Sequence, residues 1–263
     1  MISGATGSGF GVPLAGVVSE FSDAIEFIFR SRESRAGGAD VGGSQMLDLL
    51  GEHLQLTLAA SLVACLVSIP LGLWLGHIRR GSFVAISVSN VGRAVPSLAL
   101  IAFFVAYLGV GFTNVTVALA LLAIPPILTN TYVGVAQVDR DSVDAARGMG
   151  MSGLQIVRRV ELPLALPLIF GGVKTSVVNV VATATIAPLA GVVTLGDPII
   201  NVSTYGDEGR LAAAIVVAAL AVAAELSLSA LQRAVTPTGL KLGSGRTLRE
   251  RFPFPKRRVE ATP

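Results

Sequence analysis

Long uninterrupted blocks of apolar residues are the feature that most restricts how this chain can fold. A helix needs about 20 apolar residues to cross a bilayer, and four blocks meet that length. They are residues 54–77, residues 83–95 continued by 97–109, residues 115–136 and residues 211–231. A fifth apolar stretch, from Leu164 to about Val193, exceeds one span, so we expect a bend at 164–170 and a crossing from Gly171 onward. The sequence predicts an all-α polytopic membrane protein with about five transmembrane helices.

Composition agrees with lipid as the solvent of these helices. Hydrophobic residues make up 52% of the 263 residues and charged residues only 14%, whereas a soluble domain carries roughly 25% charged residues. The single cysteine excludes a disulfide framework. The two histidines, His53 and His77, flank the first span without metal-ligand spacing, so we interpret them as interfacial residues and predict no metal site.

The second span carries two residues that are unusual at membrane depth, Arg93 and Pro96. Proline frees a backbone carbonyl, and a buried charge is costly unless it faces protein or water. We favour a broken helix that lines a cavity. The alternative is an arginine that extends to the interface beside a simple kink.

The N-terminal region is predicted to lie outside the bilayer core. Residues 10–29 have apolar side chains at helical spacing, but Glu20, Asp23 and Glu26 would each cost about 2.5–3.5 kcal/mol inside lipid. An amphipathic helix on the membrane surface is therefore expected, followed by a flexible linker over residues 31–44.

Basic residues are distributed unevenly between the connections, and this asymmetry predicts orientation. Arginines gather after the first span, in the connection 137–163 and in the tail, whereas the alternate connections carry few. We expect an extracytoplasmic helix and linker over residues 1–50, a transmembrane domain over 51–242 and a basic cytoplasmic tail over 243–263. The N-terminus would lie outside and the C-terminus in the cytoplasm, where the tail would meet lipid head groups and no nucleic acid.

The connection 137–163 is the long loop on the predicted cytoplasmic side, and it reads as two short helices. Asp141 is a suitable N-cap for the first helix. Ser152 is expected to begin the second, with Gln155 at the capping-box position. Pro163 would end the unit and turn the chain into the membrane.

This loop resembles the EAA loop of ABC importer permeases, which has Glu-Ala-Ala, three residues, Gly, nine residues and Ile-x-Leu-Pro. The spacing fits throughout, with Asp144 in place of Glu and Val160 in place of Ile as departures. The resemblance implies a coupling helix in which Asp144 contacts an ATPase subunit, two alanines permit close approach and a glycine makes the turn. The implied coupling residues are Asp144, Ala145, Ala146, Gly150, Leu162 and Pro163.

Further segments over about residues 51–242 resemble the osmoprotectant branch of these permeases, which imports glycine betaine, choline, carnitine, proline betaine or related compounds. The segments are Gly51 to Leu54, Val95 to Ala99, Pro126 to Tyr132, Glu161 to Pro167, Lys174 to Ser176, Leu195 to Asp197 and Thr236 to Leu240. The permeases of methionine importers are related, and an amino acid of that type is the alternative solute. The resemblance implies a type I importer permease fold in a bacterial cytoplasmic membrane. It also implies an ABC ATPase dimer, a second permease subunit (a copy or a paralogue) and an extracytoplasmic substrate-binding protein as partners.

The chain does not carry a phosphate-binding loop of the form GxxxxGK[ST]. In its nearest approach, Gly171 to Ser176, Val173 stands where glycine must precede Lys174. We therefore expect a transport subunit that is not itself an enzyme and holds no cofactor, with ATP and Mg²⁺ bound by the partner ATPase.

Polar residues at membrane depth are candidates to line the translocation path. The candidates are Asn90, Arg93, Pro96, Ser176 and Asn179. The polar ones among them can equally hydrogen-bond across packed helices, and Glu225 is expected to pair with a neighbouring helix. An ion-coupled secondary transporter is a less favoured alternative, because it would need inverted repeats and more intramembrane acids. A membrane enzyme ranks last, because no His, Cys or paired carboxylates converge at one depth.

Overall fold

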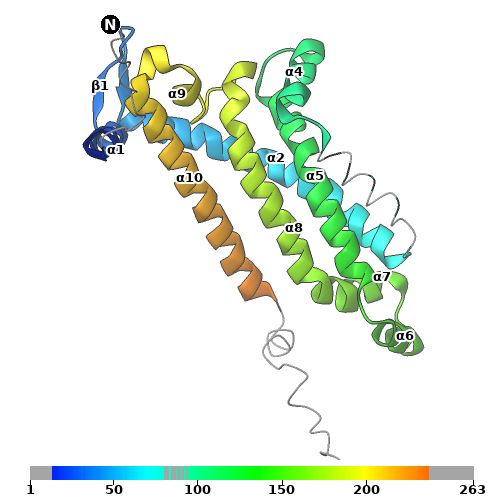
Figure 1. Ribbon diagram of the computed structural model, residues 1–263. Coiled ribbons are helices and arrows are strands. Elements are labelled where there is room, and N and C mark those ends of the chain that lie inside the picture. Colours follow the sequence, from blue (N-terminus) through cyan, green and yellow to red (C-terminus); the bar gives the residue numbers. More distant parts are fainter. Residues whose placement is uncertain are drawn as a thin grey trace, which may run out of the picture.

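The computed structural model describes residues 14–79, 83, 87, 90, 92 and 94–236, and Figure 1 shows an assembly of long helices. The N-terminal elements are α1 (Leu14–Phe29), β1 (Ser31–Glu33), β2 (Asp40–Gly42) and α2 (Ser44–His77). The central elements are α4 (Ser97–Leu108), α5 (Phe112–Ala136), α6 (Arg140–Gly148), α7 (Gly153–Ile156) and the π-helical turn η1 (Val157–Glu161). The last elements are α8 (Leu162–Thr183), the 3₁₀ helix η2 (Ala184–Ala190), α9 (Asp197–Ile200) and α10 (Val202–Val235).

Four helical segments within the described residues are long and apolar enough to cross a membrane. They are α2, α5, the rod from Gly153 to Ala190 and α10, and α4 is a shorter apolar helix. The expected all-α polytopic fold is confirmed, and the count comes close to the expected five. The first span is longer than predicted, because α2 begins at Ser44 and not at residue 54. Met46, Leu49 and His53 form a buried stripe that continues the helix toward its N-terminus.

The fifth apolar stretch was predicted to bend at 164–170, and this prediction is wrong. Helix α8 runs without interruption from Leu162 to Thr183 and includes Pro167. Pro163 does not end the preceding unit; it lies in the first turn of α8, where its missing N–H costs little. The carbonyl of Pro167 accepts a hydrogen bond from Gln232 Nε2 at 3.4 Å, so α10 supports this stretch from outside.

Glycines let the spans approach one another closely. Helix α2 packs against α5, which packs against α8. A Cβ on Gly72 would lie 2.7 Å from Thr131 Cβ, and one on Gly76 would lie 2.6 Å from Val135 Cβ. Lipid provides no hydrophobic drive between spans, so such close packing is what holds them together.

The N-terminal region is more ordered than the sequence indicates. The expected amphipathic helix is present as α1, but the predicted flexible linker is wrong, because residues 31–42 form an antiparallel hairpin of β1 and β2. Buried Ala24 and Phe27 of α1 share a core with Tyr205 and Ala212 of α10. The apolar residues of the opposite stripe are exposed, namely Val18, Phe21, Ile25 and Phe29.

The elements outside the long helices gather at two ends. Figure 1 shows the hairpin, α9 and α4 at one end and α6 and α7 at the other. The loop that resembles a coupling element therefore lies far from the N-terminal hairpin.

Candidate functional site

The loop between α5 and η1 begins with a capped helix, but the cap is not the predicted residue. Asp139 precedes α6, and its Oδ1 accepts a hydrogen bond from the backbone N–H of Asp141 at 3.4 Å. Ser142 Oγ donates to the other carboxylate oxygen of Asp139 at 3.3 Å. The helix thus starts two residues earlier than an N-cap at Asp141 would place it. Both aspartates suit the position, so sequence alone could not choose between them.

The turn between α6 and α7 follows the predicted pattern. Helix α6 ends at Gly148, and Gly150 has a φ of +79°, a conformation that favours glycine. The capping box at Ser152 is confirmed, because its backbone N–H donates to Gln155 Oε1 at 2.8 Å. These local signals fix the path of the loop.

The two adjacent alanines of α6 differ in burial, because they lie on different faces of the helix. Ala146 is 2% exposed and packs with Val138, Val143 and Ile156 in a small core beneath the helix. Ala145 is exposed on the outer side. Ala146 therefore closes the loop on itself, while Ala145 leaves space for another molecule.

The outer face of the loop combines charged with apolar side chains. The side chain of Asp144 is 68% exposed and lies 3.3 Å from Arg147 Nη1. Met149 and Leu154 are 73% and 68% exposed. Exposed Met149 and Leu154, together with Ala145 and Asp144, form a surface suited to a protein partner.

A buried contact that the sequence analysis missed joins the loop to the first span. Glu161 of η1 is 1% exposed, and its Oε2 lies 2.7 Å from His77 Nδ1 at the end of α2. Arg79 Nη2 also donates to the backbone carbonyl of Val138 at 2.8 Å. His77 was predicted to be simply interfacial, whereas it ties α2 to the base of the loop. Leu162 and Pro163 continue directly from Glu161 into α8.

We expect His77→Ala to lower the stability of the protein by about 1–3 kcal/mol, because it leaves the buried carboxylate of Glu161 without its partner. Thermal unfolding of the purified protein in detergent measures the change. The control is His77→Ala combined with Glu161→Leu, which removes both polar partners and should recover most of the loss. A single variant as stable as the unmodified chain would contradict the role of this contact.

The predicted path residues do not share one environment. Ser176 is fully buried and donates to the carbonyl of Ala123 on α5 at 2.9 Å, which makes it a contact between packed helices. Asn179, Asn90 and Pro96 are exposed on this single chain, so their faces are free to line a path or meet a second subunit. Arg93 lies outside the described residues.

Pro96 marks a break in the second apolar segment. Its backbone is extended, with φ −64° and ψ 124°, and α4 begins at the next residue. The proline therefore starts a helix and does not kink the middle of one. A short helix after extended backbone agrees with the broken span expected from the sequence.

Two charged residues within the spans pair with each other. Lys174 Nζ of α8 lies 3.5 Å from Glu225 Oε1 of α10 and donates to Ser229 Oγ at 3.2 Å. Glu225 thus pairs with a neighbouring helix, as predicted. The segment from Gly171 to Ser176 lies inside α8, so its backbone N–H groups do not form a phosphate cradle.

Comparison with known proteins shows that most of this chain, including the α6–α7 loop, matches one protein family. The family described as binding-protein-dependent transport system inner membrane component matches residues 68–238. The chain is 38% identical over 200 residues to the glycine betaine/carnitine/choline transport system permease protein OpuCB of Bacillus subtilis, covering 76% of this chain and 92% of that protein. It is 36% identical over 200 residues to the choline transport system permease protein OpuBB of the same organism, with the same two coverages.

The fold is similar to that of solved transporters. An inward-facing structure of the MetNI methionine ABC transporter matches with a TM-score of 0.64 and 22% identity, covering 73% of this chain and 96% of that chain. A structure of an amino acid ABC transporter with histidines matches with a TM-score of 0.56 and 21% identity, covering 72% of this chain and 94% of that chain.

Proposed function

This chain belongs to the family of binding-protein-dependent transport system inner membrane components, and on that premise we propose that it is the permease subunit of an ATP-driven importer of osmoprotectants. The permease character comes from the family and from relatives that are transport permeases. The solute class comes from the names of those relatives, which refer to glycine betaine, carnitine and choline. The methionine transporter shares the fold at 22% identity, so an amino acid ranks second as solute.

The observation that carries this proposal is the form of the α6–α7 loop. It presents Ala145 and Asp144 outward, and it rests on a core closed by Ala146. The α6–α7 loop is thus a compact projection, called the knob below, with a small residue on its outer face. Such a projection suits insertion into a groove of an ATPase subunit. The contact between His77 and Glu161 would then pass a displacement of the knob to α2.

Orientation follows from the distribution of basic residues. We assign the end with α6 and α7 to the cytoplasm and the end with the hairpin and α9 to the outside of a bacterial cytoplasmic membrane. The ATPase would meet the first end, and a substrate-binding protein would meet the second. Residues 1–13 and 237–263, which include the basic tail predicted over 243–263, lie outside the described residues.

The proposed mechanism is alternating access driven from the cytoplasmic end. Two permease subunits enclose the path, and closure of the ATPase pair on ATP draws their α6 helices together. Because each loop is tied to α2 and continues into α8, the spans follow and the path opens outward. ATP binding thus biases a two-state element through its different affinity for the two states.

Deleting the gene for this chain should abolish ATP-dependent uptake of at least one labelled osmoprotectant among glycine betaine, choline and carnitine. Methionine uptake in the same cells serves as the control and should not change. A tag on the restored chain should co-purify an ABC ATPase. Loss of methionine uptake alone would transfer the assignment to the amino acid alternative, and uptake without any ATPase would contradict the proposal.

A further inference from the structure

Helix α10 contains a kink near the end that carries α9. Gly206 has φ 74° and ψ 177°, far from helical values, so residues 202–205 form a separate first turn. A φ of this sign favours glycine. A Cβ at this position would also lie 2.4 Å from Glu208 Oε2 and 2.7 Å from Arg35 Nε. A side chain at this kink would therefore collide with the ion pair between Arg35 and Glu208.

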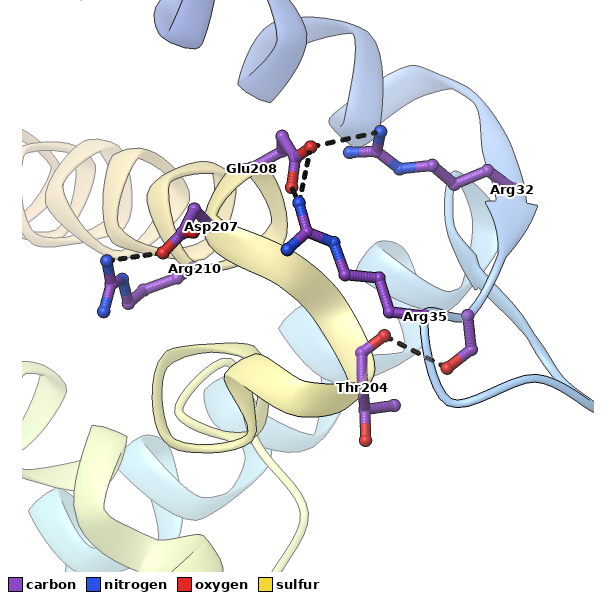
Figure 2. Close-up of polar contacts among 7 residues, drawn as sticks. Arg32, Arg35, Thr204, Asp207, Glu208 and Arg210 are labelled. Atoms are coloured by element: carbon purple, nitrogen blue, oxygen red, sulfur yellow. Dashed lines mark hydrogen bonds and ion pairs between the residues drawn. The ribbon is translucent and has the colours of Figure 1, made fainter.

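The connection between β1 and β2 holds the chain on both sides of this kink, as Figure 2 shows. On the near side, the carbonyl of Thr204 accepts hydrogen bonds from Ser34 Oγ at 3.0 Å and from the backbone N–H of Arg35 at 3.1 Å. On the far side, Arg35 Nη2 lies 3.1 and 3.0 Å from the two carboxylate oxygens of Glu208. Ser34 and Arg35 thus contact α10 on both sides of the kink.

A second chain of contacts ties α9 to the same hairpin. The backbone N–H of Gly42 donates to Gln45 Oε1 at 3.3 Å, and Gln45 Nε2 donates to the Tyr205 hydroxyl at 3.3 Å. That hydroxyl donates to Asp197 Oδ2 of α9 at 2.7 Å. The first turn of α10 and α9 are consequently linked to the hairpin as one body.

The hairpin itself rests on a buried core shared by α1 and α10. Phe27 of α1 is 1% exposed and lies beneath α10, where a Cβ on Gly209 would be 3.0 Å from its ring. The Arg32 guanidinium lies 4.6 Å from the centre of that ring and 3.9 Å from Glu208 Oε1. An ion pair held by an ordered base loses less side-chain entropy on forming than an isolated surface pair does.

We propose that residues 31–43 act as a clasp that fixes the α10 kink, with Arg35 as its positioning residue, and so present α9 in one position at the outer end of the permease. The clasp lies before residues 68–238, the range matched by the family. The effect of the clasp on transport rests on the proposed function. If that function is right, α9 lies at the end of the permease where a loaded substrate-binding protein docks.

Hydrogen exchange of the purified full-length chain with its ATPase tests the clasp directly. In Arg35→Glu, two carboxylates would face each other across the kink. We expect the amides of residues 202–206 to exchange about fivefold faster, the factor expected for loss of an exposed ion pair. The matched control is Arg30→Glu, since among the contacts described the Arg30 side chain pairs only with Glu26 of α1, four residues earlier, at 2.8 Å.

Reconstituted uptake tests the positioning role. For Arg35→Glu, the concentration of loaded binding protein that gives half-maximal uptake should rise about fivefold, while ATP hydrolysis without binding protein stays unchanged. Arg35→Lys should retain most of the function. Arg35→Glu combined with Glu208→Arg restores an opposite-charge pair and should recover the function only in part, because Arg32 remains close to position 208 and would repel the new arginine.

Unchanged exchange at residues 202–206 in Arg35→Glu would overturn the clasp. Faster exchange with an unchanged dependence on binding protein would overturn the positioning role. If the unmodified complex shows no uptake that depends on a binding protein, the proposed function fails, and the exchange measurement still decides whether the clasp exists.

Discussion

Replacing Ala145 by tryptophan is expected to reduce uptake by about tenfold or more, close to complete loss, because an indole on the outer face of α6 would hold the ATPase away from its docking position. Ala145 is exposed and does not belong to the small core that Ala146 closes. The loop itself should therefore fold normally. Uptake of labelled solute, the amount of chain in the membrane and co-purification of the ATPase are the three measurements.

Ala145→Ser is the control for this position, because a hydroxyl adds little volume and should leave uptake near normal. Ala146→Trp gives a further comparison, since it would disrupt the core with Val143 and Ile156 and lower the amount of folded chain as well. Normal uptake by Ala145→Trp would show that this face of α6 meets no partner.

Leucine at both Gly72 and Gly76 should prevent α2 and α5 from packing and reduce the amount of folded protein severely. A Cβ at these positions would already lie 2.7 Å from Thr131 Cβ and 2.6 Å from Val135 Cβ, before the rest of a leucine is added. Overpacking typically costs about 1–3 kcal/mol per site, and the two sites face the same helix. The monodisperse fraction on size-exclusion chromatography and the thermal unfolding temperature measure the effect.

Gly51→Leu is the matched control on the same helix. A Cβ on Gly51 has no neighbour within 4 Å, and leucine has a better helix propensity than glycine by up to about 1 kcal/mol. This variant should be as stable as the unmodified chain or slightly more stable. Equal stability of Gly72→Leu/Gly76→Leu and Gly51→Leu would exclude close packing at the α2–α5 seam.

Hydropathy was sufficient to predict the four long apolar helices found within the described residues, because lipid allows few alternatives to such helices. It did not locate the start of α2, because the predicted span begins at residue 54, whereas the helix continues back to Ser44 and includes the charged Asp48 and Glu52. The buried stripe of Met46, Leu49 and His53 was the available signal, since it keeps the helical period. A charge count locates the membrane boundary and does not locate the end of a helix.

The hairpin could not be predicted, because the contacts that anchor it to α10 come from residues far away in the chain. Residues 31–44 are polar and glycine-rich, which is typical of a linker. Ser34 bonds to Thr204 across 170 positions, and local composition carries no trace of such a partner. The contact of His77 with Glu161, 84 positions apart, was missed for the same reason.

The coupling loop was predicted well in its local geometry and less well in its surface. Capping and turn residues act over three or four positions, so Ser152, Gln155 and Gly150 could be assigned from the sequence alone. Which of two adjacent alanines faces outward depends on the core beneath the helix. Ser176 likewise could be separated from Asn179 only once the position of Ala123 was known.

The π-helical turn η1 has a consequence for how motion of the loop reaches the span. The N–H of Leu162 bonds to the carbonyl of Val157, five residues back, so this turn contains one residue more than an α-helical turn. One residue corresponds to about 100° of rotation about the axis. The direction in which the α6–α7 loop leaves α8 is thus set by a single surplus residue, and a tightening of that turn would rotate α6 around the axis of α8.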